Sequence, residues 1–145
     1  MAEKRFKKWK PPSFDTKNMT QWNWMCQHHK KLILGKAVDI GAFTYINAKN
    51  GVHIEDDVQI GSHCSLYSVS TIDHKQGKIL LKKNCRIGTH SVIMPGVTIG
   101  RNAVIGAFSF VNTDIPDNTI AYGIPANVQR KLTKKEIEKL KEAFK

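Results

Sequence analysis

One of the six histidines in this chain stands where a proton-transferring side chain could work. The six are His28, His29, His53, His63, His74 and His90. Imidazole has a pKa near 6.5, so a histidine can take a proton from a hydroxyl or an amine at neutral pH. His74 lies in the longest interruption of the repeat described below, Asp73–Leu80, and loops held out from a rigid scaffold often carry function. His74 is therefore the candidate general base, with a surface histidine of no function as the alternative.

Asp73, directly before His74, is a second candidate in the same interruption. Its carboxylate could orient the imidazole or bind a hydroxyl of a substrate. A solvated loop charge is the alternative, and the sequence alone leaves both open.

The cysteines and the other histidines do not suggest a metal site. Cys26, Cys64 and Cys85 are odd in number and widely spaced, which favours neither a zinc site nor a redox pair. Cys64 and Cys85 fall where the repeat places a small inward residue, which predicts buried free thiols in a reducing cytoplasm. Counting along the repeat puts the outward-pointing His63 and His90 on different faces.

These candidates are positioned by a six-residue repeat. Aliphatic residues recur at Leu81, Ile87, Ile93, Ile99, Ile105 and Val111. Small or β-branched residues follow four places later, at Cys85, Ser91, Val97, Ala103 and Ser109. Neither a helix nor an ordinary strand has this period, whereas hexapeptide spacing is typical of parallel β-helices. Three hexads would make one triangular coil, stacked on the next at about 4.8 Å.

The same spacing extends toward the N-terminus with two interruptions. The predicted inward positions are Ile40, Ile46, Ile54, Ile60, Leu66, Ile72, Leu81, Ile87, Ile93, Ile99, Ile105 and Val111. They predict an all-β fold, a parallel β-helix of about four coils over residues 36–128. Segment 48–53 and the Asp73–Leu80 interruption are expected to project at corners.

Two flanking segments complete the predicted organisation. Residues 1–35 are expected to form a basic arm and a capping helix over about 16–34, because Met19, Trp22 and Met25 have loosely helical spacing. Trp22 and Trp24 could instead line a substrate pocket. Residues 129–145 should hold a C-terminal helix that opens with the capping box Thr133–Glu136 and presents Ile137, Leu140 and Phe144 on one face.

The net charge of +11 lies mostly in the two tails. Residues 1–10 hold five Lys or Arg against one Glu, and residues 130–145 hold seven against three. No basic stripe interleaved with aromatic residues runs along the repeat, so we do not expect nucleic-acid binding. No run of 18 apolar residues exists, so no membrane span is expected. The charge is better suited to a small phosphate-bearing ligand.

The run IGTHSVIMPGVTIGRNAVIGAFSFVNTDIPDNTIAYGIPANVQRKL resembles the left-handed β-helix, hexapeptide-repeat acyltransferases. Within that family it is most similar to galactoside and maltose acetyltransferases and to relatives acting on nucleotide-linked amino sugars, over residues 36–132. The resemblance implies a left-handed coil and a cytoplasmic homotrimer with acetyl-CoA between protomers and no metal. It also implies acetyl transfer to a hydroxyl or amine of a sugar or nucleotide-linked sugar, with His74 as base.

Further site residues are implied only by position in the family. Asn47 matches an acceptor-binding asparagine, with a turn-stabilising role as the alternative. Arg86 stands where many relatives have Trp in the wall of the acceptor or pantetheine site. Cofactor contacts would come from Thr89 and Ala107 at the pantetheine arm, from Asn112 and Thr113 near the adenine end, and from Arg130 and Lys131. Arg130 and Lys131 would face the phosphates, unless they are solvated charges before the basic helix. The His74 loop is shorter than in the galactoside-type enzymes.

Two other functions remain open from the sequence. A non-catalytic scaffold could use the same repeat. A γ-class carbonic anhydrase shares the architecture but needs a close histidine pair and a third histidine from a neighbour to hold zinc. The histidine spacing in this chain disfavours that reading.

Overall fold

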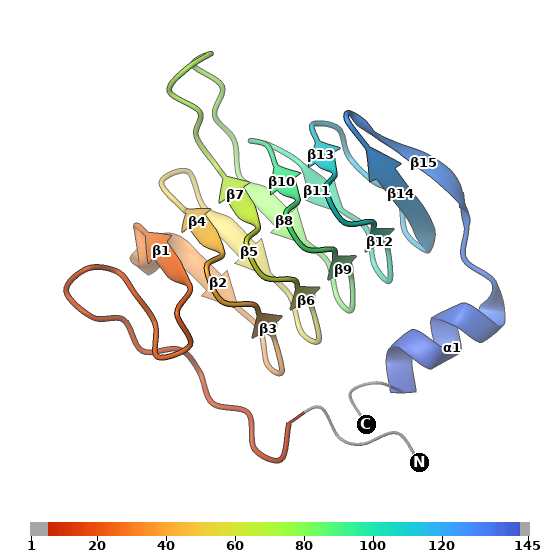
Figure 1. Ribbon diagram of the computed structural model, residues 1–145, viewed down its shortest axis with the longest axis horizontal. Helices are drawn as coiled ribbons and strands as arrows, with labels where there is room; N and C mark the ends of the chain where they lie inside the picture. The colour runs from red at the N-terminus through yellow and green to blue at the C-terminus, as the bar shows by residue number, and fades with distance from the viewer. Residues whose placement is uncertain (1–5, 143–145) are drawn as a thin grey trace.

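Three parallel β-sheets wrap around one another as the sides of a prism (Figure 1). The structure is a computed structural model that describes residues 6–142. Face one holds β1 (Met25–Gln27), β4 (Tyr45–Asn47), β7 (Ser65–Tyr67), β10 (Val92–Ile93) and β13 (Phe110–Val111). Face two holds β2 (Leu32–Leu34), β5 (Val52–Ile54), β8 (Ile79–Leu81) and β11 (Thr98–Ile99). Face three holds β3 (Asp39–Ile40), β6 (Gln59–Ile60), β9 (Arg86–Ile87), β12 (Val104–Ile105), β14 (Thr119–Gly123) and β15 (Ala126–Lys131).

Each coil runs through faces one, two and three in that order, and the turns after them are corners one, two and three. Strands pair in parallel with their equivalents one coil away, except that β15 pairs antiparallel with β14. The predicted parallel β-helix is therefore confirmed. Its left-handed sense stays a prediction.

The core is built of columns of inward side chains. On face one the register stacks Cys26, Ile46, Leu66, Ile93 and Val111, and each of them is 0% exposed. Burying an aliphatic side chain contributes about 1.5–3 kcal/mol relative to leaving it exposed. Because a single coil has no interior of its own, this stabilisation exists only between neighbouring coils.

Close stacking decides the residue type at the corners. A Cβ added to Gly61 would lie 2.7 Å from the backbone nitrogen of Thr89 in the next coil, so glycine is required there. Another corner position takes a left-handed backbone in successive coils, for example at Asn84 (φ 62°), Asn102 (φ 58°) and Asn118 (φ 56°). Asparagine tolerates this conformation better than most residues.

The predicted N-terminal capping helix is wrong. Residues 25–34 contain β1 and β2, which pair with β4 and β5 as part of the first coil. In the predicted 16–34 span the helical structure is the short 3-10 helix η1 (His29–Lys31). Trp24 is 3% exposed and packs edge-on against Phe14, so it closes the open end of the first coil. Trp24 thus has a packing role, and Trp22 and Trp24 also line a cavity of about 420 Å³, as the pocket alternative predicts.

The structure has about five coils rather than four. One coil was missed at the N-terminal end, as described above. At the other end the pattern continues past Val111, because Ile115 bridges to Ile99 and β14 pairs with β12. Pro116 lies in a turn, where a missing N–H costs no ladder hydrogen bond.

Ile72 is not an inward residue, and this corrects the predicted frame. Its side chain is 94% exposed, and Leu81 fills the face-two position beside Ile54 instead. Residues 68–78 leave the prism at corner one as a projecting segment, the corner loop (green in Figure 1). An antiparallel bridge between Val69 and Gln76 holds its two arms together.

The C-terminal helix α1 (Lys134–Glu142) is confirmed, after the unpredicted strand β15. The Glu136 N–H donates to Thr133 Oγ1 at 3.2 Å, which is one of the two hydrogen bonds of the predicted capping box. The Glu136 side chain accepts the Thr133 hydroxyl at 3.2 Å in place of the Thr133 backbone N–H. Ile137 and Leu140 are half-buried; Phe144 lies outside the described residues. Among residues 6–142 no helix is long and apolar enough to cross a membrane.

The contrast between Leu81 and Ile72 gives a matched test of the frame. Leu81→Ala should lower the free energy of unfolding by about 2–5 kcal/mol, because it leaves a cavity in the prism. Ile72→Ala should change it by no more than about 0.5 kcal/mol, since that side chain is in solvent. Urea unfolding of both variants at one protein concentration measures the difference. Equal losses would contradict the assignment of Leu81 as the core residue.

Candidate active site

His74 lies in the exposed part of the corner loop, and its backbone has the left-handed conformation (φ 58°). The neighbouring Asp73 is held within the loop: its carboxylate accepts the Lys75 N–H at 3.4 Å and pairs with the Lys75 ammonium at 3.4 Å. The pKa of Asp73 is lowered, first by a hydrogen bond from the Ser70 side chain and then by the contacts with Lys75. The carboxylate is therefore ionised. Asp73 is next to His74 in the sequence, but its carboxylate contacts Ser70 and Lys75.

Asn47 lies at the base of the corner loop. Its carbonyl accepts hydrogen bonds from the Ser68 N–H at 3.0 Å and from Ser68 Oγ at 2.6 Å, which fixes the point where the loop departs from face one. Its side-chain Oδ1 accepts the Lys49 N–H at 3.1 Å, the turn-stabilising contact considered from the sequence. Binding of an acceptor by Asn47 stays a prediction. The structure nevertheless brings the predicted acceptor residue and the loop with the predicted base together.

The outward side of face one beside Asn47 is aromatic. Tyr45 and Tyr67 pack with ring centroids 5.5 Å apart, and the Tyr45 hydroxyl donates to Gln27 Oε1 at 2.7 Å. A sugar ring could pack on such a surface while its hydroxyls reach polar groups like Asn47. This aromatic pair was not found from the sequence, although Tyr at outward positions of two successive coils is its signal.

Corner three holds Thr89 and Ala107 in stacked coils. Thr89 is half-buried, its hydroxyl donates to Ser62 O at 2.8 Å, and it also lies 2.8 Å from His90 Nδ1. Ala107 is exposed directly beyond it. The two predicted pantetheine contacts therefore share one corner, which is adjacent to face one.

Beside them runs a column of rings, Phe43, His63, His90 and Phe108. Neighbouring centroids lie 5.2, 4.8 and 4.9 Å apart. The prediction that His63 and His90 occupy different faces is wrong; the error follows from counting Ile72 as an inward residue, which rotated the frame by one side. The sequence signal of this column is Gly-x-Phe or Gly-x-His at corner three of four successive coils.

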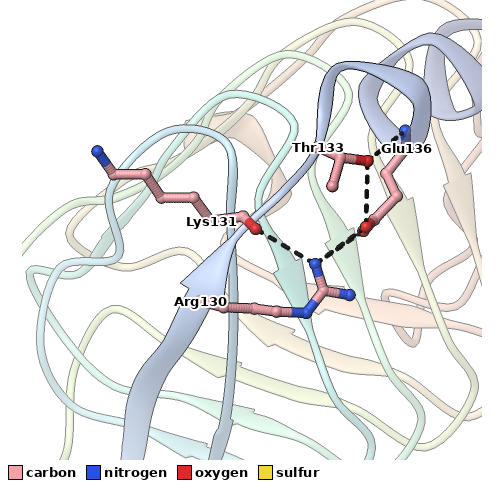
Figure 2. Close-up of polar contacts among 4 residues, drawn as sticks. All are labelled: Arg130, Lys131, Thr133 and Glu136. Atoms are coloured by element: carbon pink, nitrogen blue, oxygen red, sulfur yellow. Dashed lines mark hydrogen bonds and ion pairs between the residues drawn. The ribbon is translucent and has the colours of Figure 1, made fainter.

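The residues predicted from the family to lie near the adenine end and the phosphates of the cofactor are in the last coil. Asn112 and Thr113 are exposed just after β13. Arg130 Nη1 pairs with Glu136 Oε1 at 3.0 Å and Oε2 at 3.2 Å, and this contact lowers the pKa of Glu136 (Figure 2). Figure 2 shows the Lys131 ammonium extending away from that pair. Lys131 is therefore the more available cation of the two for a phosphate.

Arg86 lies on β9 of face three, a different face from Asn47. Its guanidinium donates to Asn84 Oδ1 at 3.2 Å and to the Leu140 carbonyl of α1 at 2.7 Å. These contacts attach the C-terminal helix to the prism. The predicted part of Arg86 in an acceptor or pantetheine wall stays a prediction.

The thiols are held in the interior. Cys64 and Cys85 are free and buried, as predicted, and Cys26 is free and buried as well. Burial raises the pKa of Cys26 to about 12 and raises those of Cys64 and Cys85 as well. Nucleophilic attack requires the thiolate, so none of the three is suited to that role. Among residues 6–142, no three His, Cys, Asp or Glu side chains gather into a metal-binding group.

Comparison with known proteins identifies the repeat. Residues 78–113 match the family described as Bacterial transferase hexapeptide (six repeats). Galactoside O-acetyltransferase of Lactococcus lactis subsp. lactis (strain IL1403) is 35% identical over 113 residues, covering 68% of this chain and 55% of that protein. Residues 78–113 are thus a hexapeptide repeat of the bacterial transferase type, and the resemblance to the hexapeptide-repeat acyltransferases is confirmed. The chain spans about half the length of that curated relative.

Two solved structures share the fold. A hexapeptide-repeat acetyltransferase from Vibrio cholerae O1 biovar eltor, in complex with acetyl coenzyme A, superposes with a TM-score of 0.71 at 29% identity, covering 76% of this chain and 65% of that one. A mutant N-acyltransferase from Bacillus cereus, in complex with dTDP-4-amino-4,6-dideoxyglucose and coenzyme A, gives 0.57 at 25% identity, covering 83% and 86%. The first neighbour is an acetyltransferase and the second acts as an N-acyltransferase.

The raised thiol pKa values lead to a labelling prediction. At pH 8 the native protein should show no rapidly reacting thiol toward Ellman's reagent, because burial keeps the thiols protonated and covered. In about 6 M guanidinium chloride the three thiols should all react within minutes. Absorbance at 412 nm counts them in both states. A fast, stoichiometric reaction of the native protein would contradict the buried assignment.

Proposed function

We propose that this protein is an acetyl-CoA-dependent acetyltransferase that acetylates a hydroxyl or amine of a sugar or nucleotide-linked amino sugar. The observation that carries the proposal is the interruption of a hexapeptide solenoid by a histidine-bearing loop anchored at Asn47. Solenoids of the same fold bind acetyl-CoA or coenzyme A in neighbouring structures. The named activity of the Lactococcus relative supports a sugar acceptor.

His74 would act as the general base. It would take the proton of the acceptor hydroxyl or amine as that atom attacks the thioester carbonyl, and coenzyme A would leave as the thiol. Asp73 would keep a negative charge beside the imidazolium that forms. Asn47 would hold an acceptor hydroxyl beside Tyr45 and Tyr67, at the foot of the loop.

Acetyl-CoA would lie along corner three and face one. Thr89 and Ala107 would contact the pantetheine arm, and Asn112 and Thr113 the adenine end. Lys131 would face the phosphates, together with Arg130, which is paired with Glu136. No metal is needed for this chemistry.

A homotrimer would complete the site, with each thioester held between two protomers. His74 and Ala107 are both exposed in one chain, which leaves room for a neighbour to enclose them. Three reduced thiols in the core suit a cytoplasmic protein.

A non-catalytic scaffold is the second candidate, because the fold alone does not require catalysis. Release of thiol from acetyl-CoA in the presence of galactosides, maltose and dTDP- or UDP-amino sugars distinguishes the two. The stacked pair His63 and His90 is a feature that favours a γ-class carbonic anhydrase. Stoichiometric zinc in the purified protein, together with CO2 hydration, would be required for that function.

Substitution of the base gives the sharpest test of the mechanism. His74→Ala should lower kcat by roughly 10²–10⁴-fold, measured as thiol release from acetyl-CoA with the best acceptor. His53→Ala, which changes a histidine on the outside of face two, is the matched control and should retain activity. Near-normal turnover of His74→Ala would remove His74 from the mechanism.

The two cations of the last coil should differ in their effect on cofactor binding. Lys131→Gln should raise the KM for acetyl-CoA by about tenfold with little change in kcat, the loss expected for one hydrogen bond to a charged group. Arg130→Gln should raise it less, because Glu136 already neutralises that guanidinium. Steady-state kinetics at varied acetyl-CoA measure both. The reverse order would show that Arg130 leaves Glu136 when the cofactor binds.

A further inference from the structure

A pocket of about 420 Å³ at corner one is surrounded by lysines. Lys30, Lys31, Lys49 and Lys78 line it, together with Gly51. Within the part of the chain that the structure describes, the lining contains no aspartate or glutamate. A second pocket of about 570 Å³, with His28 and His29 among its lining residues, shares Lys30 and Lys31 with it.

The pocket follows from the register of face two. Leu32, Val52 and Ile79 are stacked partners, so the residues just before them, Lys31, Gly51 and Lys78, stack as well. At about 4.8 Å per coil, Lys31 and Lys78 begin about 10 Å apart with no side chain between them. A Cβ on Gly51 would lie 3.6 Å from Lys78 Cγ, which shows that the Lys78 side chain runs over the glycine.

One of these ammonium groups, that of Lys31, is held in place by a neutral group. Lys31 Nζ donates to the Lys49 carbonyl at 3.0 Å, a contact that orients the ammonium while leaving its charge intact. Three successive coils thus contribute cations to one small space. Like charges placed together repel one another, and the arrangement is stabilised when an anion enters. The pocket is large enough for one or two phosphate groups and too small for a nucleic-acid strand.

The position of the pocket connects it to the proposed active site. Lys78 is the last residue of the corner loop that carries His74, and Lys49 follows Asn47 by two residues. The cations that would serve acetyl-CoA, Arg130 and Lys131, lie in the last coil, whereas this pocket belongs to the first three. We propose that the lysine pocket binds phosphate groups of the acceptor, so that the acceptor is a phosphate-bearing sugar. This inference rests on the proposed function.

Direct binding tests the pocket independently of catalysis. Isothermal titration of the full chain with dTDP, and separately with inorganic pyrophosphate, should show affinity that falls at least tenfold in the double variant Lys31→Gln/Lys78→Gln. The double variant Lys134→Gln/Lys141→Gln removes the same charge from α1 and should bind both ligands as the unaltered protein does. Unchanged binding of both ligands by the pocket variant would overturn the proposal.

Coenzyme A distinguishes the two possible sources of phosphate. Its affinity should stay the same in the pocket variant, because its phosphates are assigned to the last coil. An equal loss for coenzyme A and dTDP would overturn the assignment to the acceptor. Circular dichroism and the Tm of each variant establish that folding is retained, and Lys31→Arg/Lys78→Arg should recover most of the dTDP affinity.

Turnover separates this inference from the proposed function. In the pocket variant kcat/KM should fall at least tenfold for a dTDP- or UDP-amino sugar and stay the same for a neutral galactoside. Equal kcat/KM values for the phosphate-bearing acceptor in variant and unaltered protein would overturn the pocket's role. Absence of acetyl transfer to every acceptor would instead refute the proposed function, while the titrations would still decide whether the pocket binds phosphate.

Discussion

The whole structure depends on stacking one coil on the next at the spacing of neighbouring β-strands. At that distance each inward residue contacts its equivalents above and below, so the interior becomes columns such as Cys26, Ile46 and Leu66. The chain must turn at each corner within a few residues. This requires glycine where the backbones of neighbouring coils touch, and residues with a left-handed backbone conformation where the chain changes direction. The prism therefore has little freedom in its own residues. Chemistry can be added at corners, on outward faces and in excursions.

Polar groups obey the same stacking rule as the aliphatic ones. At corner two Asn84 donates to Asn102 at 2.8 Å and Asn102 donates to Asn118 at 2.7 Å, which satisfies side-chain amides that are largely buried. Arg86 joins this ladder through Asn84 and also binds the Leu140 carbonyl. The hydrogen-bonded corner thus extends to the C-terminal helix, which has half-buried residues but no fully buried ones. The contacts of Arg86 with Leu140 and of Arg130 with Glu136 therefore help to hold that helix to the prism.

The sequence predicts the middle of the solenoid well and its ends poorly, for a physical reason. Between Leu81 and Val111 every hexad is regular, and every predicted inward residue is buried. In the first coil the inward residues Cys26 and Leu34 are eight apart, and the strands around them are three residues long. Such strands are stabilised by pairing with the next coil, and a pattern of neighbouring residues in the sequence does not reveal this pairing.

The prediction for Ile72 was wrong for a different reason. Ile72 keeps the hexad spacing, but the chain leaves the prism at Ser68, whose hydroxyl donates a hydrogen bond to the Asn47 carbonyl. The interruption itself still indicated His74, whereas the ring column and the lysine pocket needed the corrected register.

The distribution of positive charge along the prism would orient the two substrates in the proposed site. Lysines cluster at corner one of the first three coils, and Arg130 and Lys131 lie in the last coil. The corner loop with His74 departs from the third coil, between these two ends. A phosphate-bearing acceptor and acetyl-CoA would then be held by their charged parts at opposite ends of the prism. Their uncharged ends, the sugar and the thioester, would meet at the imidazole. Because the two phosphate sites lie coils apart on a rigid scaffold, neither substrate could occupy the other's site without placing its reactive group away from His74.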